Sequence, residues 1–264
     1  MRLLKKESLY LFEFPALSRI SGVIHAVTSR LGGTSLPPFD ALNLSLDVGD
    51  DSRLVMMNRF QVRKAAGGGI QVYGRQAHGT DIAVISDIET DTRSTPEAPD
   101  IRTIIGTADA LITNVPGIRL VIQTADCQAV LVVDPEKQVV ANIHSGWRGS
   151  AANIIQHALS RMTAEFGCNP RDMVAAIGPS LGPCCAEFIH YQTELPQALW
   201  PFRTGAHHFD FWRISRHQLM KAGVSGDHIH IADICTRCNP HLFFSYRKAR
   251  ETGRFAALIG LDAD

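Results

Sequence analysis

Residues 124–150, TADCQAVLVVDPEKQVVANIHSGWRGS, consist of two apolar runs separated by the tetrapeptide Asp-Pro-Glu-Lys. This tetrapeptide favours a β-turn because proline suits the second turn position, so the stretch predicts an antiparallel hairpin. If Asp134 faces Lys137, an unbulged ladder pairs Cys127 directly with His144, with Cβ atoms about 5 Å apart. A bulge or a longer loop shifts this register by one residue and still leaves both side chains near one end of the sheet.

Other short apolar runs, punctuated by Gly, Pro, Asn and Asp, are typical of strands. With the hairpin they give expected strands at 10–14, 24–28, 71–73, 82–85, 110–113, 120–124, 130–133 and 139–143. Helical periodicity predicts helices at 51–66, 150–166 and 213–222, each followed by a glycine that suits a helix C-terminus. Consecutive strands without regularly inserted helices favour an α+β protein with mixed sheets. Residues 86–103 are polar and contain two prolines, which indicates an exposed loop.

The length of 264 residues suffices for a large core, and we expect one domain spanning residues 1–264. The chain has 26 basic and 26 acidic side chains, which gives no electrostatic reason to expect nucleic acid or an anionic membrane as a partner. The first twenty residues do not resemble a signal peptide, and no run reaches the roughly 18 apolar residues of a membrane span. These features favour a cytoplasmic protein that binds a small molecule and keeps its cysteines reduced.

Cys127 and His144 are both good zinc ligands, and a catalytic zinc site typically has three protein ligands and one open position. The best third candidate is His78, which lies between a short strand and a glycine-containing turn. The same cysteine and histidine also match a cysteine hydrolase, in which the histidine deprotonates the nucleophile. His78 distinguishes these interpretations, because a dyad does not require a third ligand.

The segment after His144, Ser-Gly-Trp-Arg-Gly, leads directly into the expected helix at 150–166. Free backbone N–H groups at a helix start suit an anion such as phosphate, and Arg148 adds a positive charge. The alternative interpretation of this segment is an ordinary turn with an exposed arginine.

The remaining cysteines give weaker signals. Cys235 and Cys238 have CxxC spacing but lack a second matching pair for a structural zinc site, so we interpret them as packing residues. Adjacent Cys184 and Cys185 follow a Gly-Pro turn, which favours burial or a place in a pocket wall.

Several motifs in one order resemble the YfiH-like family, also described as laccase-domain or multicopper polyphenol oxidoreductase proteins and associated with purine nucleoside phosphorylase activity. The resemblance covers nearly the whole chain. The matching motifs are HAVTSRLGGTSLPPFDALNLSLDVGDD, VYGRQAHGTDIAVI, ADALITNVPGIRLVIQTADC, NIHSGWRGS, AAIGPSLGPCCAEF, DICTRC, FFSYRK and TGRFAALIGL.

The resemblance implies an α/β/β/α layered fold in a mostly monomeric cytoplasmic protein, with zinc held by His78, Cys127 and His144. It implies phosphorolysis of adenosine, inosine and methylthioadenosine, with an accompanying adenosine deaminase activity. Arg30 and Arg148 match family motif arginines, and we expect both to contact phosphate or substrate.

Three other functions stay open. A cysteine-dependent amidase or editor of cell-wall precursors keeps Cys127 and His144 and is the first alternative. A copper oxidase needs more histidine ligands, often in H-x-H pairs, and the sequence offers only the pair at 228 and 230. A zinc-stabilised binding protein without activity is the third. For the enzyme, Asp126 beside Cys127, or Asp81 near His78, is the candidate to orient a ligand.

Overall fold

Two β-sheets form the centre of the computed structural model, which describes residues 1–104 and 106–263. Within those residues, the eight-stranded sheet runs in the order β1 (Arg2–Lys6), β2 (Leu9–Glu13), β3 (Val23–Thr28), β14 (Phe255–Leu261), β9 (Ile118–Thr124), β4 (Ile70–Tyr73), β7 (Ala98–Ile104) and β6 (Thr92–Thr95). The six-stranded sheet runs in the order β13 (Ile229–Ile231), β12 (Val174–Ile177), β10 (Gln128–Asp134), β11 (Val139–Ser145), β8 (Ala110–Thr113) and β5 (Ile82–Val84).

The α-helices are α1 (Ser52–Ala65), α2 (Ile88–Asp91), α3 (Trp147–Ala151), α4 (Ile154–Phe166), α5 (Tyr191–Glu194) and α6 (Phe211–Lys221). Short 3₁₀ turns occur at η1 (Leu17–Arg19), η2 (Gln197–Phe202) and η3 (Gly226–His228). Among residues 1–104 and 106–263, none of these helices has both the length and the apolar character needed to cross a membrane.

Alternating side chains divide each central strand between two cores. On β9, Leu120 and Ile122 face the core between the sheets, whereas Val121 faces the core under α1. On β10, Leu131 faces the core between the sheets and Val132 faces the core under α4 and α6. The central strands of both sheets are therefore buried on two faces, in agreement with their nearly continuous apolar sequences.

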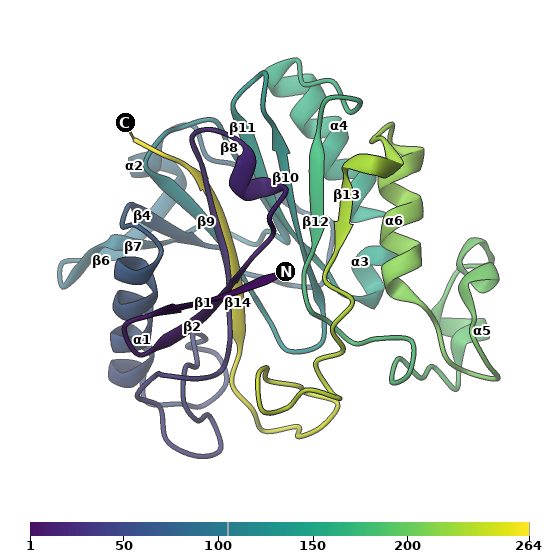
Figure 1. Ribbon diagram of the computed structural model, residues 1–264, viewed down its shortest axis with the longest axis horizontal. Coiled ribbons are helices and arrows are strands. Elements are labelled where there is room, and N and C mark those ends of the chain that lie inside the picture. The colour runs from purple at the N-terminus through teal and green to yellow at the C-terminus, as the bar shows by residue number, and fades with distance from the viewer. Residues whose placement is uncertain (105, 264) are drawn as a thin grey trace.

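The four layers follow from these cores. In Figure 1, α1 lies on one side of the paired sheets and α4 and α6 lie on the other. Most neighbouring strands are antiparallel, but β4 is parallel to both β7 and β9, and β5 and β12 each have a parallel neighbour. The predicted α+β fold, with an α/β/β/α arrangement of mixed sheets in one domain, is confirmed.

The expected helices at 51–66 and 213–222 correspond to α1 and α6, which begin at aspartate N-caps. The carboxylate of Asp51 accepts the Arg53 N–H at 2.8 Å, and that of Asp210 accepts the Arg213 N–H at 2.9 Å. The helix expected at 150–166 is confirmed from Ile154 to Phe166, where α4 ends at Gly167 as expected, but its start is wrong. Residues 150 and 151 belong to the separate helix α3, because Asn153 adopts the left-handed region at φ 57° and interrupts the helical path.

The loop expected at 86–103 is also wrong, because this segment contains α2, β6 and most of β7. The β7 strand pairs with β4, and its Ala98, Ile101 and Ile104 side chains are buried. Pro96 lies in the turn between β6 and β7. The apolar residues spaced along this segment are typical of a strand. The charged residues and prolines around them favoured the prediction of a loop instead.

The hairpin of residues 124–150 forms, but its register differs from the predicted one. Asp134 pairs with Val139 and His144 pairs with Ala129, not with Cys127. The turn is longer than expected because the Asp134 carboxylate accepts the N–H groups of both Glu136 and Lys137, each at 3.0 Å. The shift is two residues, so it leaves every side chain on its predicted face of the sheet.

Candidate functional site

Three sequence-predicted residues meet at one end of the inter-sheet layer. His78 lies in the loop after β4, Cys127 immediately precedes β10, and His144 lies near the end of β11. One side-chain donor atom from each residue lies within 4.8 Å of the other two. Cys127 Sγ is 3.8 Å from His78 Nε2, and the two imidazole rings meet edge to face with centroids 4.8 Å apart. The structure thus brings the predicted trio together, although Cys127 and His144 are not direct strand partners.

Gly146 has no side chain, and this leaves room for the three-residue cluster. A Cβ atom at this position would lie 3.0 Å from Cys127 Sγ and 3.0 Å from His78 Cδ2. Both distances are shorter than ordinary carbon contacts. A side chain at position 146 would therefore crowd the cluster, in addition to the place of this glycine at the N-cap of α3.

The fully buried carboxylate of Asp109 positions both histidines. His144 Nδ1 lies 2.7 Å from Asp109 Oδ1, an arrangement that leaves His144 Nε2 directed toward Cys127. The same carboxylate accepts backbone N–H groups from Ala77, His78 and Gly79 at 3.1, 2.9 and 2.8 Å. Burial by itself raises the pKa of Asp109, but these hydrogen bonds outweigh it and hold the pKa below its usual value. An ionised carboxylate behind a histidine is the usual support of a metal ligand.

Sequence reasoning missed Asp109 and considered two other aspartates. Asp126 instead accepts the Thr236 hydroxyl and the Arg247 backbone N–H, each at 2.6 Å, and Asp81 accepts the Thr107 hydroxyl at 2.9 Å. The available signal was the repeated Thr-Ala-Asp motif, whose first copy ends at Asp109 directly before the buried strand β8.

Cys127 and His144 ionise as a pair in the protein without bound metal. Burial opposes the charge on Cys127, but His144, followed by His78, more than offsets this and lowers the pKa of the thiol to about 6. Burial likewise opposes the charge on His144, but Cys127 and Asp109 raise the pKa of the imidazole to about 9. A thiolate therefore faces an imidazolium at neutral pH.

The donor set fits a metal ion with an open coordination position. One thiolate and two imidazole nitrogens converge from three separate segments. The other ring nitrogen of His144, Nδ1, is hydrogen-bonded to Asp109. This is the ligand chemistry and the supporting hydrogen bond expected of a three-ligand zinc site.

The cluster forms part of the wall of a cavity of about 730 Å³. The cavity has aromatic walls and several cationic groups, namely Trp147, Phe188, Phe211 and Tyr246, with Arg148, Arg247 and Arg254. Arg148 is exposed, and its guanidinium lies over the Trp147 ring at 4.1 Å from the centroid. Burial lowers the pKa of Arg254, and the nearby charge of Cys127 opposes that effect. Arg247 and Arg254 were not singled out from the sequence, although both lie in motifs that carry the family resemblance.

The structure does not bring Arg30 to this cavity. Its guanidinium forms an ion pair with Asp40, with Nη2 and Oδ2 3.2 Å apart, and donates to the Pro240 carbonyl at 3.0 Å. It also lies over the Phe244 ring at 4.6 Å from the centroid. These contacts join the loop after β3 to the segment before β14.

Known proteins resemble the chain along most of its length. It is 33% identical over 252 residues to purine nucleoside phosphorylase YlmD of Geobacillus stearothermophilus, covering 91% of this chain and 90% of the relative. It is 32% identical over 257 residues to purine nucleoside phosphorylase YfiH of Escherichia coli, covering 94% and 97% of the two chains. The crystal structure of Bacillus licheniformis hypothetical protein YfiH superposes with a TM-score of 0.84 at 29% identity, covering 97% of each chain. Since residues 24–262 match the family described as multi-copper polyphenol oxidoreductase laccase, the chain belongs to that family.

Proposed function

We propose that this chain is a zinc-dependent purine nucleoside phosphorylase. One observation carries the proposal: His78, Cys127 and His144 converge on the wall of a cavity of about 730 Å³ that also presents aromatic faces and guanidinium groups. A nucleoside needs an apolar surface for its base, and phosphate needs cationic donors. Relatives at 33% and 32% identity are named purine nucleoside phosphorylases, which supports the same activity here.

His78, Cys127 and His144 would hold the zinc ion. Bound there, zinc would act as a Lewis acid and polarise a substrate atom in the cavity. We propose zinc over copper because a mixed thiolate and imidazole trio suits catalytic zinc. Within residues 1–104 and 106–263, His228 and His230 join neither of the two groups of potential metal ligands, so the additional histidines of a multicopper centre are not supplied by this pair.

The chain's own groups divide the remaining tasks. Aromatic side chains such as Phe188 and Tyr246 present faces on which a purine can stack, and Arg148 and Arg254 offer donors for phosphate. In phosphorolysis, a phosphate oxygen forms a bond to the sugar anomeric carbon while the bond from that carbon to the base breaks. The base leaves with the bonding electrons and takes up a proton, giving free purine and ribose 1-phosphate. Holding both reactants in one cavity supplies proximity for this exchange.

The proposed substrates are adenosine, inosine and methylthioadenosine. The proposal includes a second reaction, in which water replaces the amino group of adenosine and gives inosine and ammonia. It also includes a cytoplasmic monomer that acts without nucleic acid or membrane partners. Light scattering of the purified protein tests the monomer, since a dimer doubles the measured mass.

A cysteine-dependent amidase, with cell-wall precursors as one substrate class, is the second candidate. The thiolate of Cys127 and the imidazolium of His144 form the ion pair that such an enzyme uses, and Asp109 holds the imidazole. The two functions require the same two side chains, but only the zinc enzyme requires His78.

Product analysis of metal-defined protein separates the candidates. Protein loaded with zinc is incubated with adenosine and with inosine, in the presence and absence of phosphate. We expect ribose 1-phosphate and free base only with phosphate, and inosine from adenosine without it. His78→Ala should lose bound zinc and nucleoside turnover together, whereas Cys168→Ser should retain both because Cys168 lies outside the cluster. Full turnover by metal-free His78→Ala protein would contradict the zinc mechanism.

A further inference from the structure

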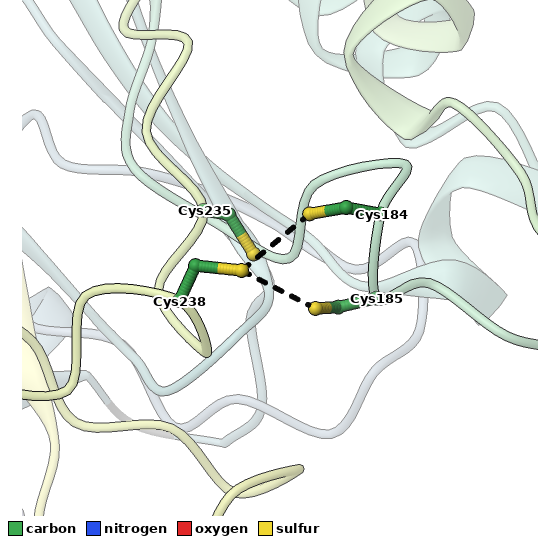
Figure 2. Close-up of side chains that lie close together, drawn as sticks. All are labelled: Cys184, Cys185, Cys235 and Cys238. Carbon is green, nitrogen blue, oxygen red and sulfur yellow. Dashed lines mark hydrogen bonds between the residues drawn. The ribbon is translucent and has the colours of Figure 1, made fainter.

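A second group of potential metal ligands consists of Cys184, Cys185, Cys235 and Cys238. The first two follow β12 in one loop, and the other two lie in the loop after β13. Figure 2 shows the four sulfur atoms turned toward one another from these two loops. The burial expected from the sequence is confirmed for Cys185 and Cys235 but not for Cys184 and Cys238, which are exposed. The sequence showed no second pair for the CxxC pair because the adjacent Cys-Cys pair lies about fifty residues earlier.

The sulfur spacing matches tetrahedral coordination of one ion. Cys238 Sγ lies 3.6 Å from Cys184 Sγ and 3.5 Å from Cys185 Sγ, and all four sulfurs lie within 4.8 Å of one another. Four thiolates at the zinc–sulfur distance of about 2.3 Å on a tetrahedron have sulfur–sulfur edges of about 3.8 Å. A disulfide requires a sulfur–sulfur distance of about 2.05 Å, and all six cysteines are free.

Backbone contacts hold the two loops in this arrangement. Ser180 and Cys235 form a parallel bridge, in which Ser180 N–H donates to the Ile234 carbonyl at 3.2 Å and Thr236 N–H donates to the Ser180 carbonyl at 3.0 Å. Gly182 permits the close approach, since a Cβ atom there would lie 3.0 Å from Cys235 Cβ and 2.8 Å from the Trp212 ring. The loops thus present the cysteines together through contacts that do not involve the sulfur atoms.

Polar donors also face the sulfurs. The backbone N–H groups of Gly182 and Cys238 lie near Cys235 Sγ, and the Arg237 guanidinium lies near Cys185 Sγ. Four thiolates around a divalent ion carry a net charge of about −2, and such donors stabilise that charge.

We infer that Cys184, Cys185, Cys235 and Cys238 form a second metal site, a zinc tetrathiolate that stabilises the structure. Four protein ligands leave no open position, which distinguishes this site from the three-ligand cluster in the cavity. Soft thiolates favour zinc or iron, and the compact sulfur spacing suits a single ion rather than an iron–sulfur core between the ligands.

The proposed site connects with the cavity through Asp126. The hydroxyl of Thr236, inside the CxxC segment, donates to the Asp126 carboxylate at 2.6 Å, and the Leu181 N–H donates to the Asp126 carbonyl at 2.8 Å. Asp126 directly precedes Cys127. A tetrathiolate zinc therefore fixes the loops that hold one side of the cavity, without contacting substrate.

Metal analysis of four proteins purified without chelator tests the inference. We expect about two zinc ions per chain in the unmodified protein and about one in the Cys235→Ser/Cys238→Ser double variant. His78→Ala should also retain about one, and Cys168→Ser should retain the full content as a control for loss of a cysteine. Equal zinc in the double variant and the unmodified protein overturns the second site. Iron in place of zinc overturns the metal assignment. If the cavity cluster binds no zinc, the unmodified protein and His78→Ala have equal contents, while the double variant still loses its zinc.

Cobalt spectra keep the inference testable if the double variant fails to fold. His78→Ala protein retains the four cysteines and is loaded with one equivalent of Co²⁺ under reducing conditions. We expect the visible bands of tetrahedral cobalt, with strong thiolate-to-cobalt charge transfer. Absence of that charge-transfer band, or loss of two titratable thiols to a disulfide in protein kept under reducing conditions, overturns the tetrathiolate.

Discussion

At Asp109, one carboxylate receives hydrogen bonds from the His144 ring and from three consecutive backbone N–H groups around His78. The residues around His78 lie about thirty residues before Asp109, and His144 lies 35 residues after it. No local sequence pattern therefore reveals the arrangement. The carboxylate is fully buried, and it is satisfied only because two candidate ligands are correctly placed.

Asp109→Asn should weaken zinc binding at the cavity cluster by about 10–100-fold, because an amide cannot hold the His144 ring as a carboxylate does. Competition with a chromophoric chelator measures the affinity. Asp81→Asn is the matched control, since Asp81 bonds Thr107 and neither histidine. Unchanged zinc affinity in Asp109→Asn protein would show that the carboxylate does not support the ligands.

Gly146→Ala should reduce zinc occupancy of the same cluster, because the added methyl lies 3.0 Å from both Cys127 Sγ and His78 Cδ2. Gly205→Ala is the control, since a Cβ atom at Gly205 meets no atom within 4 Å. Zinc content and turnover are measured in both variants. Equal occupancy in the two proteins would mean that the histidine and cysteine can move aside without losing the ion.

At the scale of the element, β11 joins the site to the core. Its inner face carries Val140, Asn142 and His144, so the face that packs between the sheets ends at a candidate ligand. Asn142 Nδ2 donates to the Leu120 carbonyl at 3.0 Å and to the Ala257 carbonyl at 2.8 Å, both in the opposite sheet. One side chain therefore ties the two sheets together by hydrogen bonds within an otherwise apolar layer.

Asn142→Leu should lower the free energy of unfolding by about 1–3 kcal/mol, because leucine keeps much of the volume but cannot donate to the two carbonyls. Urea unfolding followed by circular dichroism measures the change. Val140→Leu, on the same face of β11, reports the cost of altered packing alone. An Asn142→Leu protein as stable as the unmodified one would show that these bonds do not stabilise the fold.

The sequence allowed the elements to be predicted better than their connections. The two apolar runs predicted β10 and β11, and a two-residue change in register keeps facing side chains on one face of the sheet. Turn length was not predictable from Asp-Pro-Glu-Lys, because the Asp134 carboxylate stabilises a longer turn through two backbone donors. The four-cysteine cluster was also missed, because a single bridge between Ser180 and Cys235 joins loops that are distant in the sequence.

At the scale of the whole molecule, stability should fall in mild acid because of His25. This buried side chain lies on β3, and its Nε2 accepts the Phe14 N–H at 2.8 Å. Burial lowers the pKa of His25 from 6.5 to about 4, so the unfolded chain binds a proton that the folded chain does not between these values. Stability therefore decreases as pH falls from 6.5 toward 4, and no further loss from His25 occurs below that window.

Between pH 7 and pH 5, the free energy of unfolding should fall in both proteins. The fall should be about 2 kcal/mol smaller in His25→Gln than in the unmodified protein. Glutamine can still accept the Phe14 N–H but does not titrate. Unfolding by urea at both pH values gives the two differences, and contributions from zinc and from other titrating groups cancel when the proteins are compared. Equal pH dependence in the two proteins would exclude His25 as the source.

The position of β14 has a consequence for synthesis of the protein on the ribosome. This strand pairs with β3 on one side and β9 on the other, near the middle of the eight-stranded sheet, yet it follows every other strand within residues 1–104 and 106–263. A nascent chain that has not emerged through residue 261 holds β1, β2 and β3 apart from β9, β4 and β7, with an unpaired edge on each group. Unpaired edges promote association between chains, so during translation the sheet depends on β14 to close this gap.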